Sequence, residues 1–78
     1  MLIGREIEVL ASRDISMLKL RGMVIDETKN LIVVLTPEER QIKIPKRIVT
    51  LGIYDSRKGI MTIEGSKIVG TPADRIKG

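Results

Sequence analysis

The chain has 78 residues, which is enough for one small domain. It contains no cysteine and no histidine, and this excludes disulfide bonds, thiolate or imidazole metal sites and histidine-dependent catalysis. Fourteen basic against ten acidic side chains give a net charge of +4, which suits a polyanionic partner such as nucleic acid. No apolar run is long enough to cross a membrane and no signal peptide is recognisable, so we expect a cytoplasmic protein.

The apolar residues are mainly isoleucine, leucine and valine, with one tyrosine and no phenylalanine or tryptophan. β-Branched side chains fit a pleated surface, so this composition favours strands over helices. Charged residues make up 31% of the chain, whereas asparagine and glutamine occur once each. This balance is typical of thermophilic proteins.

The first part of the chain predicts strands separated by polar turns. Residues 5–9 alternate between apolar and charged side chains, as a half-buried strand does. Residues 11–16 are polar enough for a loop. Residues 17–25 continue as a strand through Gly22, where we expect a bend or a bulge. In the turn that follows, Asn30 is the expected residue with positive φ.

The middle of the chain predicts three further strands. Residues 31–35 are apolar on both faces, and we expect them to form the most central strand. Residues 41–45 alternate regularly, with the isoleucines inward and Lys43 outward. Pro45 lacks an N–H group and must therefore lie at a sheet edge or a strand end. Residues 48–54 form the third of these strands.

The end of the chain predicts a hairpin and a short helix. Residues 60–64 and 67–69 would pair around a turn at Gly65 and Ser66. The sequence TPAD then begins a helix over about residues 72–77, with a threonine N-cap and a proline at the first helical position. Six or seven short strands in one domain over residues 1–78 predict an all-β fold. A small, strongly bent barrel is favoured because closure removes exposed sheet edges.

The densest group of cations lies in residues 40–47, which contain four basic and no acidic side chains. Convergent cations on a rigid strand suit phosphate contacts, although a solvated edge strand protected by lysine has the same pattern. Two cations at a loop tip, Arg57 and Lys58, are expected to contribute less. The expected RNA-binding residues are Arg40, Lys43, Lys46 and Arg47, with Lys19, Arg21 and Lys29 as secondary contributors.

Other side chains limit the possible chemistry. Tyr54 is the only aromatic residue, so RNA recognition would depend on backbone charge and shape rather than on base stacking. The adjacent acids Asp26 and Glu27 are interpreted as a turn, with Asp26 bonded to local backbone and Glu27 solvated. We therefore predict no catalytic residue and no metal site in this chain.

Three segments in register resemble one family, the archaeal ribonuclease P protein component 1, whose members have an Sm-like barrel. They are residues 20–30 (LRGMVIDETKN), residues 43–46 (KIPK) and the stretch from Ile63 to the ending TPADRIK. Their order and spacing match the family over nearly the whole chain. Two positions depart from the pattern, Thr71 where the family has arginine and Leu51 where it has phenylalanine. We expect this chain to lack the longer N-terminal extension that is common in the family.

The resemblance implies a non-catalytic, RNA-binding subunit of ribonuclease P, the endoribonuclease that removes the 5′ leader from precursor tRNA. The catalytic RNA and its Mg²⁺ would carry the chemistry, and the chain itself would bind no cofactor. A small zinc-ribbon subunit is the implied heterodimer partner, and precursor tRNA would be contacted only indirectly. We expect a monomer when the chain is free.

The partner subunit is expected to dock on the two ends of the chain, because exposed apolar side chains usually mark an interface. The candidate residues are Met1, Leu2, Ile3 and Ile76. The alternative to a ribonuclease P subunit is a PRC-barrel or KOW-like adaptor domain that binds a ribosome or a protein. Residues 2–7 and 22–26 could begin such a domain, whereas the ending TPADRIKG fits it poorly.

Overall fold

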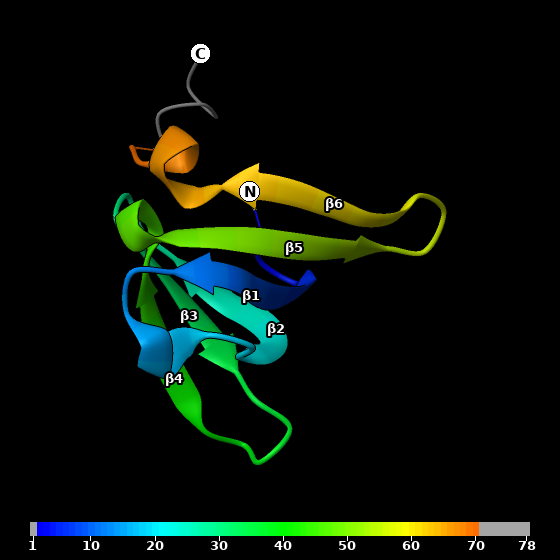
Figure 1. Ribbon diagram of the computed structural model, residues 1–78. Helices are drawn as coiled ribbons and strands as arrows, with labels where there is room; N and C mark the ends of the chain where they lie inside the picture. Colours follow the sequence, from blue (N-terminus) through cyan, green and yellow to red (C-terminus); the bar gives the residue numbers. More distant parts are fainter. Residues whose placement is uncertain (1, 71–78) are drawn as a thin grey trace.

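The structure is a computed structural model that describes residues 2–70, and these residues form six strands and three short 3-10 helices (Figure 1). The strands are β1 (Glu6–Ser12), β2 (Arg21–Glu27), β3 (Leu31–Leu35), β4 (Gln41–Pro45), β5 (Val49–Asp55) and β6 (Gly59–Glu64). The 3-10 helices are η1 (Ile15–Met17), η2 (Lys46–Ile48) and η3 (Gly65–Ile68). None of the helices in this part of the chain has the length and apolar character needed to cross a membrane. The helix expected over residues 72–77 lies outside the described residues.

The six strands form one antiparallel sheet in the order β4-β3-β2-β1-β5-β6. The sheet is strongly bent, so that β4 runs steeply across the direction of β5 and β6 (Figure 1). Helix η2 carries the chain from the end of β4 directly to the start of β5. The two halves of the sheet therefore meet at η2, and the expected small, bent, all-β barrel is confirmed.

Residues that alternate along the strands meet in one core inside the bend. Fully burying an aliphatic side chain of this size contributes about 1.5–3 kcal/mol to folding. The buried apolar residues are Leu2, Ile7, Val9, Val24, Ile32, Val34, Ile44, Val49, Leu51 and Ile53. The expected faces of β4 are confirmed, because Ile44 is buried and Lys43 is exposed, and Pro45 ends this edge strand as its missing N–H requires.

Gly22 does not form the expected bend or bulge but lies within β2, opposite Ile7. It is buried, and a Cβ atom at this position would overlap the carbonyl oxygen of Leu35 in β3. The bulges of the sheet lie elsewhere, between Val9 and Ala11 in β1 and between Val24 and Asp26 in β2. Glycine at residue 22 thus permits a close approach of two strands, and the bulges supply the local twist.

Some predicted elements differ in the structure. Residues 17–20 are not a strand, because the Asp14 carboxylate caps η1 and the chain then turns through Lys19 at a φ of 70°. Residues 67–69 do not pair with β6, because the chain leaves it through η3. Asn30, in the turn before β3, does not have the expected positive φ. Its carbonyl oxygen accepts the Lys46 N–H at 2.8 Å. The expectation that residues 31–35 form the most central strand was wrong, because β3 lies next to the edge strand β4 while β2 and β1 occupy the centre of the sheet.

Candidate nucleic-acid interface

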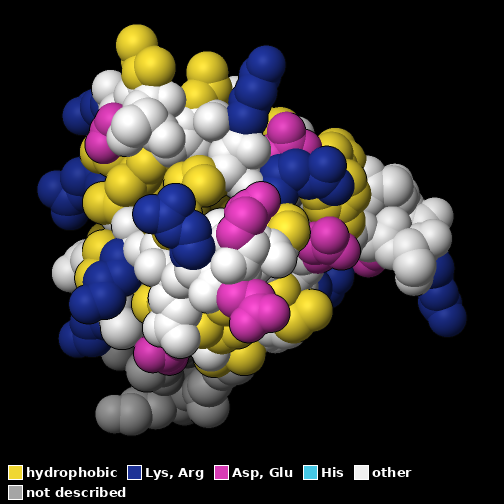
Figure 2. Space-filling view, turned by 90° about the horizontal axis from the view of Figure 1, so that it is seen from below, with side chains coloured by type: hydrophobic (Ala, Val, Ile, Leu, Met, Phe, Trp, Pro, Cys, Tyr) yellow, Lys and Arg dark blue, Asp and Glu magenta, His cyan; other side chains and the backbone are white. Residues whose placement is uncertain are grey.

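Three of the four cations predicted in residues 40–47 are exposed along the edge strand β4. Arg40 lies in the turn before the strand, Lys43 projects from it and Arg47 lies just beyond it in η2. We call these three residues the cationic edge. In Figure 2, Lys and Arg side chains predominate along the left margin, on the side where Figure 1 places β4 and η1, whereas most Asp and Glu lie nearer the centre.

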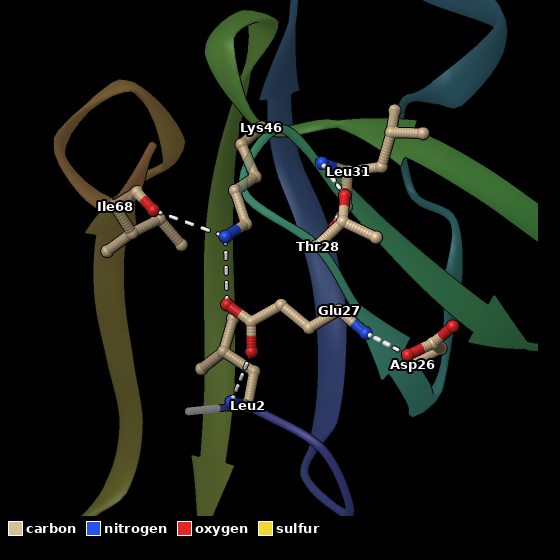
Figure 3. Close-up of polar contacts among 7 residues, drawn as sticks. All are labelled: Leu2, Asp26, Glu27, Thr28, Leu31, Lys46 and Ile68. Carbon is tan, nitrogen blue, oxygen red and sulfur yellow. Dashed lines mark hydrogen bonds and ion pairs between the residues drawn. The ribbon is translucent and has the colours of Figure 1, made fainter. Parts of the chain in front are cut away.

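Lys46, the fourth predicted cation, cannot contact RNA because its side chain is buried. Its Nζ lies 2.9 Å from Glu27 Oε2 and donates to the carbonyl oxygen of Ile68 at 3.2 Å (Figure 3). The prediction for Lys46 was therefore wrong. The alternation along β4 could have predicted this burial, because every second residue faces inward and Lys46 continues the series Ile42, Ile44.

Glu27 is likewise buried rather than solvated, which corrects its interpretation as a turn residue. One carboxylate oxygen contacts Lys46 and the other accepts the Leu2 N–H at 2.8 Å (Figure 3). The pair therefore joins four parts of the chain: the N-terminal segment, the end of β2, η2 and η3. Asp26 behaves as expected, because its Oδ1 accepts the adjacent Glu27 N–H at 2.8 Å.

The secondary cations are divided between two ends of the barrel. Lys19 and Arg21 line a shallow cleft of about 230 Å³ together with Thr36, Pro37 and Glu38, beside the turn that bears Arg40. Lys29 lies at the opposite corner, where its carbonyl oxygen accepts the Gly70 N–H at 2.9 Å and η2 is close by. Folding thus places Lys19 and Arg21 near the start of the cationic edge and Lys29 near its end.

Arg21 is partly engaged on the outer face of the sheet. Its guanidinium carbon lies 5.7 Å from the ring centroid of Tyr54, within range of a cation–π contact. The Tyr54 hydroxyl donates to Glu8 Oε1 at 2.7 Å, and this hydrogen bond raises the pKa of Tyr54 above its ordinary value. Tyr54 is therefore neutral at physiological pH and bonded to protein on both its ring and its hydroxyl.

Arg13 is a basic residue that was not among the cations predicted from the sequence. Its backbone N–H donates to the Ile48 carbonyl oxygen at 3.0 Å, which holds the end of β1 beside η2. Arg13 and Arg47 line an open cleft of about 290 Å³. The remaining lining residues are Ala11, Ser12, Ile48, Val49, Thr50, Glu64 and Ser66. No sequence pattern indicated this cleft, because its two arginines come from segments that are far apart in the chain.

The residues expected to bind a partner subunit have different environments. Leu2 is buried in the core and its N–H is bound by Glu27, so its assignment to an interface was wrong. Ile3, the next residue, is 48% exposed. Met1 and Ile76 lie outside the described residues.

The bent six-stranded barrel with a cationic edge places this protein among the small Sm-like β-barrel domains. The family described as ribonuclease P/MRP, subunit p29, matches residues 1–78. The chain belongs to this family, and the resemblance seen in the sequence is confirmed.

Individual relatives agree with this family. Ribonuclease P protein component 1 of Methanosarcina mazei is 39% identical over 85 residues, which cover 97% of this chain and 77% of the relative. The protein of the same name from Desulfurococcus amylolyticus is 38% identical over 76 residues, with 97% and 83% covered. A solved structure, Mth11, described as a homologue of the human RNase P protein Rpp29, superposes with a TM-score of 0.69 at 26% identity and covers 95% of both chains.

Proposed function

We propose that this chain is a non-catalytic, RNA-binding subunit of ribonuclease P that supports the catalytic RNA in removing the 5′ leader from precursor tRNA. The observation that carries this function is the family match over residues 1–78, together with the curated relatives named ribonuclease P protein component 1. None of these matches favours a PRC-barrel or KOW-like adaptor. Mg²⁺ would belong to the RNA, and we propose no cofactor for the chain.

The cationic edge is the surface that we propose for the RNA backbone. Lys43 lies in the β3–β4 ladder opposite Val33, so its backbone is already ordered before RNA binds. Binding then costs side-chain entropy alone, which favours this lysine over a cation in a loop. Arg40 and Arg47 extend the positive charge beyond both ends of the strand. A backbone-directed surface of this kind needs no stacking aromatics.

The test is binding to ribonuclease P RNA over a range of salt concentrations. The wild-type chain should bind this RNA more tightly than an unrelated RNA of the same length. Lys43→Ala should lower the log–log salt slope by about 0.7–0.9, as expected for one lost phosphate contact, and leave the melting temperature nearly unchanged. Equal affinity for both RNAs would contradict the proposed function.

The matched control is Lys58→Ala, in the loop between β5 and β6. It removes the same charge from an exposed lysine on another part of the barrel. We expect a smaller change in the salt slope, because this loop must be ordered before it can hold a phosphate. A larger change for Lys58→Ala would show that the binding face lies on that side of the barrel.

We further propose that a small zinc-ribbon subunit docks beside the N-terminal segment and that the free chain is a monomer. Ile3 supports this because it is 48% exposed while its neighbour Leu2 is anchored in the core. An exposed isoleucine held on a fixed backbone can contact a partner at little entropic cost. Leu2, in contrast, contributes to folding.

Ile3→Asp should weaken the heterodimer by about tenfold or more, because a charge replaces an apolar contact at the interface. Ile60→Asp in β6 is a matched control, since Ile60 is also 48% exposed. Isothermal titration calorimetry with the zinc-ribbon subunit would compare the two variants. Equal affinity of Ile3→Asp and wild type would exclude Ile3 from the interface.

A further inference from the structure

We propose that the cleft between Arg13 and Arg47 holds a single phosphate group of the RNA backbone, clamped by both guanidinium groups. The inference rests on the proposed function and assigns to it a phosphate-binding subsite beyond the end of β4. Its ligand chemistry, a phosphate oxyanion, is shared by a phosphodiester of RNA and by free inorganic phosphate. The cleft is open rather than enclosed, and this shape favours a group carried by a polymer.

The fold brings the two arginines together from different strand ends. Ser12 pairs with Val49 at the end of the β1–β5 ladder, beyond the bulge in β1. The Arg13 N–H then bonds to the Ile48 carbonyl oxygen, one residue after Arg47. Arg13 and Arg47 consequently line the same cleft. Arginine suits this task because its planar fork of N–H donors matches phosphate oxygens.

The backbone of η2 around Arg47 is held in place before any ligand binds. Lys46, the preceding residue, is buried, and its Nζ contacts Glu27 and the Ile68 carbonyl oxygen (Figure 3). Its backbone N–H donates to the carbonyl oxygen of Asn30. Helix η3 packs against η2 so closely that a Cβ atom at Gly65 would overlap the Lys46 carbonyl oxygen. The backbone of Arg47 is therefore held on both sides, so clamping a phosphate orders only its side chain.

The charges around the cleft leave both arginines available to an anion. Among the described residues, neither guanidinium takes part in an ion pair. Glu64 is the one acidic residue among the described residues that line the cleft, and Lys67 Nζ lies 4.0 Å from its Oε1. Asp14, next to Arg13 in sequence, is occupied by the hydroxyl and the N–H of Ser16 at the start of η1. The net charge of the cleft is therefore positive.

Hydroxyl groups complete the donor set. The Ser12 Oγ already accepts the Asp14 N–H at 3.0 Å, which leaves its own proton for another acceptor. Thr50 and Ser66, which also carry hydroxyl groups, are among the lining residues. The described lining residues thus include two arginines and three residues with hydroxyl groups, which are the kinds of donor that the oxygens of a phosphate group require.

The experiment compares Arg13→Gln, Arg47→Gln and the double variant in salt titrations against ribonuclease P RNA. If both arginines hold one phosphate, each single variant and the double variant should lower the log–log salt slope by nearly the same amount, about 0.7–0.9. The double variant should bind roughly ten- to a hundredfold more weakly than wild type. The control with the same loss of charge is Arg57→Gln with Lys58→Gln, for which a smaller effect is expected.

The outcomes separate this inference from the proposed function. Wild-type protein that does not bind the RNA would overturn both. RNA binding with unchanged slope and affinity in the double variant would overturn the inference alone. A double variant that lowers the slope by twice the single-variant value would also overturn it, because the arginines would then contact separate phosphates.

A second measurement distinguishes the two sources of phosphate. Inorganic phosphate is titrated into the wild-type chain while the backbone amide signals of Ser12, Arg13 and Arg47 are followed by NMR. Shifts of these signals that disappear in the double variant, together with the reduced RNA slope, support the proposal. The same shifts with an unchanged RNA slope would make the cleft a site for free phosphate and would overturn its assignment to RNA.

Discussion

Lys46→Ala is expected to lower the free energy of unfolding by about 3–5 kcal/mol, the usual cost of removing one partner from a buried ion pair. The remaining Glu27 carboxylate would be buried without its cation, since its side chain is 1% exposed. The Ile68 carbonyl oxygen would also lose the Lys46 Nζ donor. Small domains have a total stability of about 5–15 kcal/mol, so this loss is a large fraction of it.

Urea unfolding followed by circular dichroism measures the loss. Lys43→Ala is the matched control, three residues away on the exposed face of β4, and it should change the stability by less than about 0.5 kcal/mol. Lys46→Met combined with Glu27→Leu should be less destabilising than Lys46→Ala, because neither buried charge remains. A loss below about 1 kcal/mol for Lys46→Ala would show that the ion pair does not anchor η2.

Gly22→Ala is expected to destabilise the barrel by about 3 kcal/mol or more, at the upper end of the cost of overpacking. The added methyl group would overlap the Leu35 carbonyl oxygen and lie 2.6 Å from Val34 Cγ1. A carbonyl within the β2–β3 ladder cannot move without breaking strand pairing. The close contact between these strands would therefore open, and the core beneath them would be disturbed.

Gly52→Ala provides a control with the same chemical change. Gly52 is also buried, but the atoms nearest to its added methyl group would be those of the Leu10 side chain, at 3.1–3.3 Å. Leu10 is 39% exposed, so its side chain can move aside, and we expect a cost below about 1 kcal/mol. Thermal unfolding of the two variants measures the difference. Similar melting temperatures would indicate that β2 and β3 can separate without loss of stability.

Sequence patterns predicted the features that depend on near neighbours in the chain. The alternation around Lys43 correctly placed its side chain outside and Ile44 inside, because strand geometry directs successive side chains to opposite faces. Pro45 was correctly placed at a strand end because its lack of an N–H group is a property of the residue itself. The family was also predictable, since its motifs are read in order along the chain.

Tertiary structure alone decided which cations reach the surface and which of them meet. Lys46 is buried because Glu27, nineteen positions earlier, is brought to it when the sheet bends, and an attraction of that kind has no local signal. Arg13 and Arg47 face one cleft because the end of β1 pairs with the start of β5. By itself, the sequence determined the strand character, the faces of β4 and the family of this protein. Only the folded chain decided which charges are paired inside and which remain free for an anion, because these depend on contacts between distant segments.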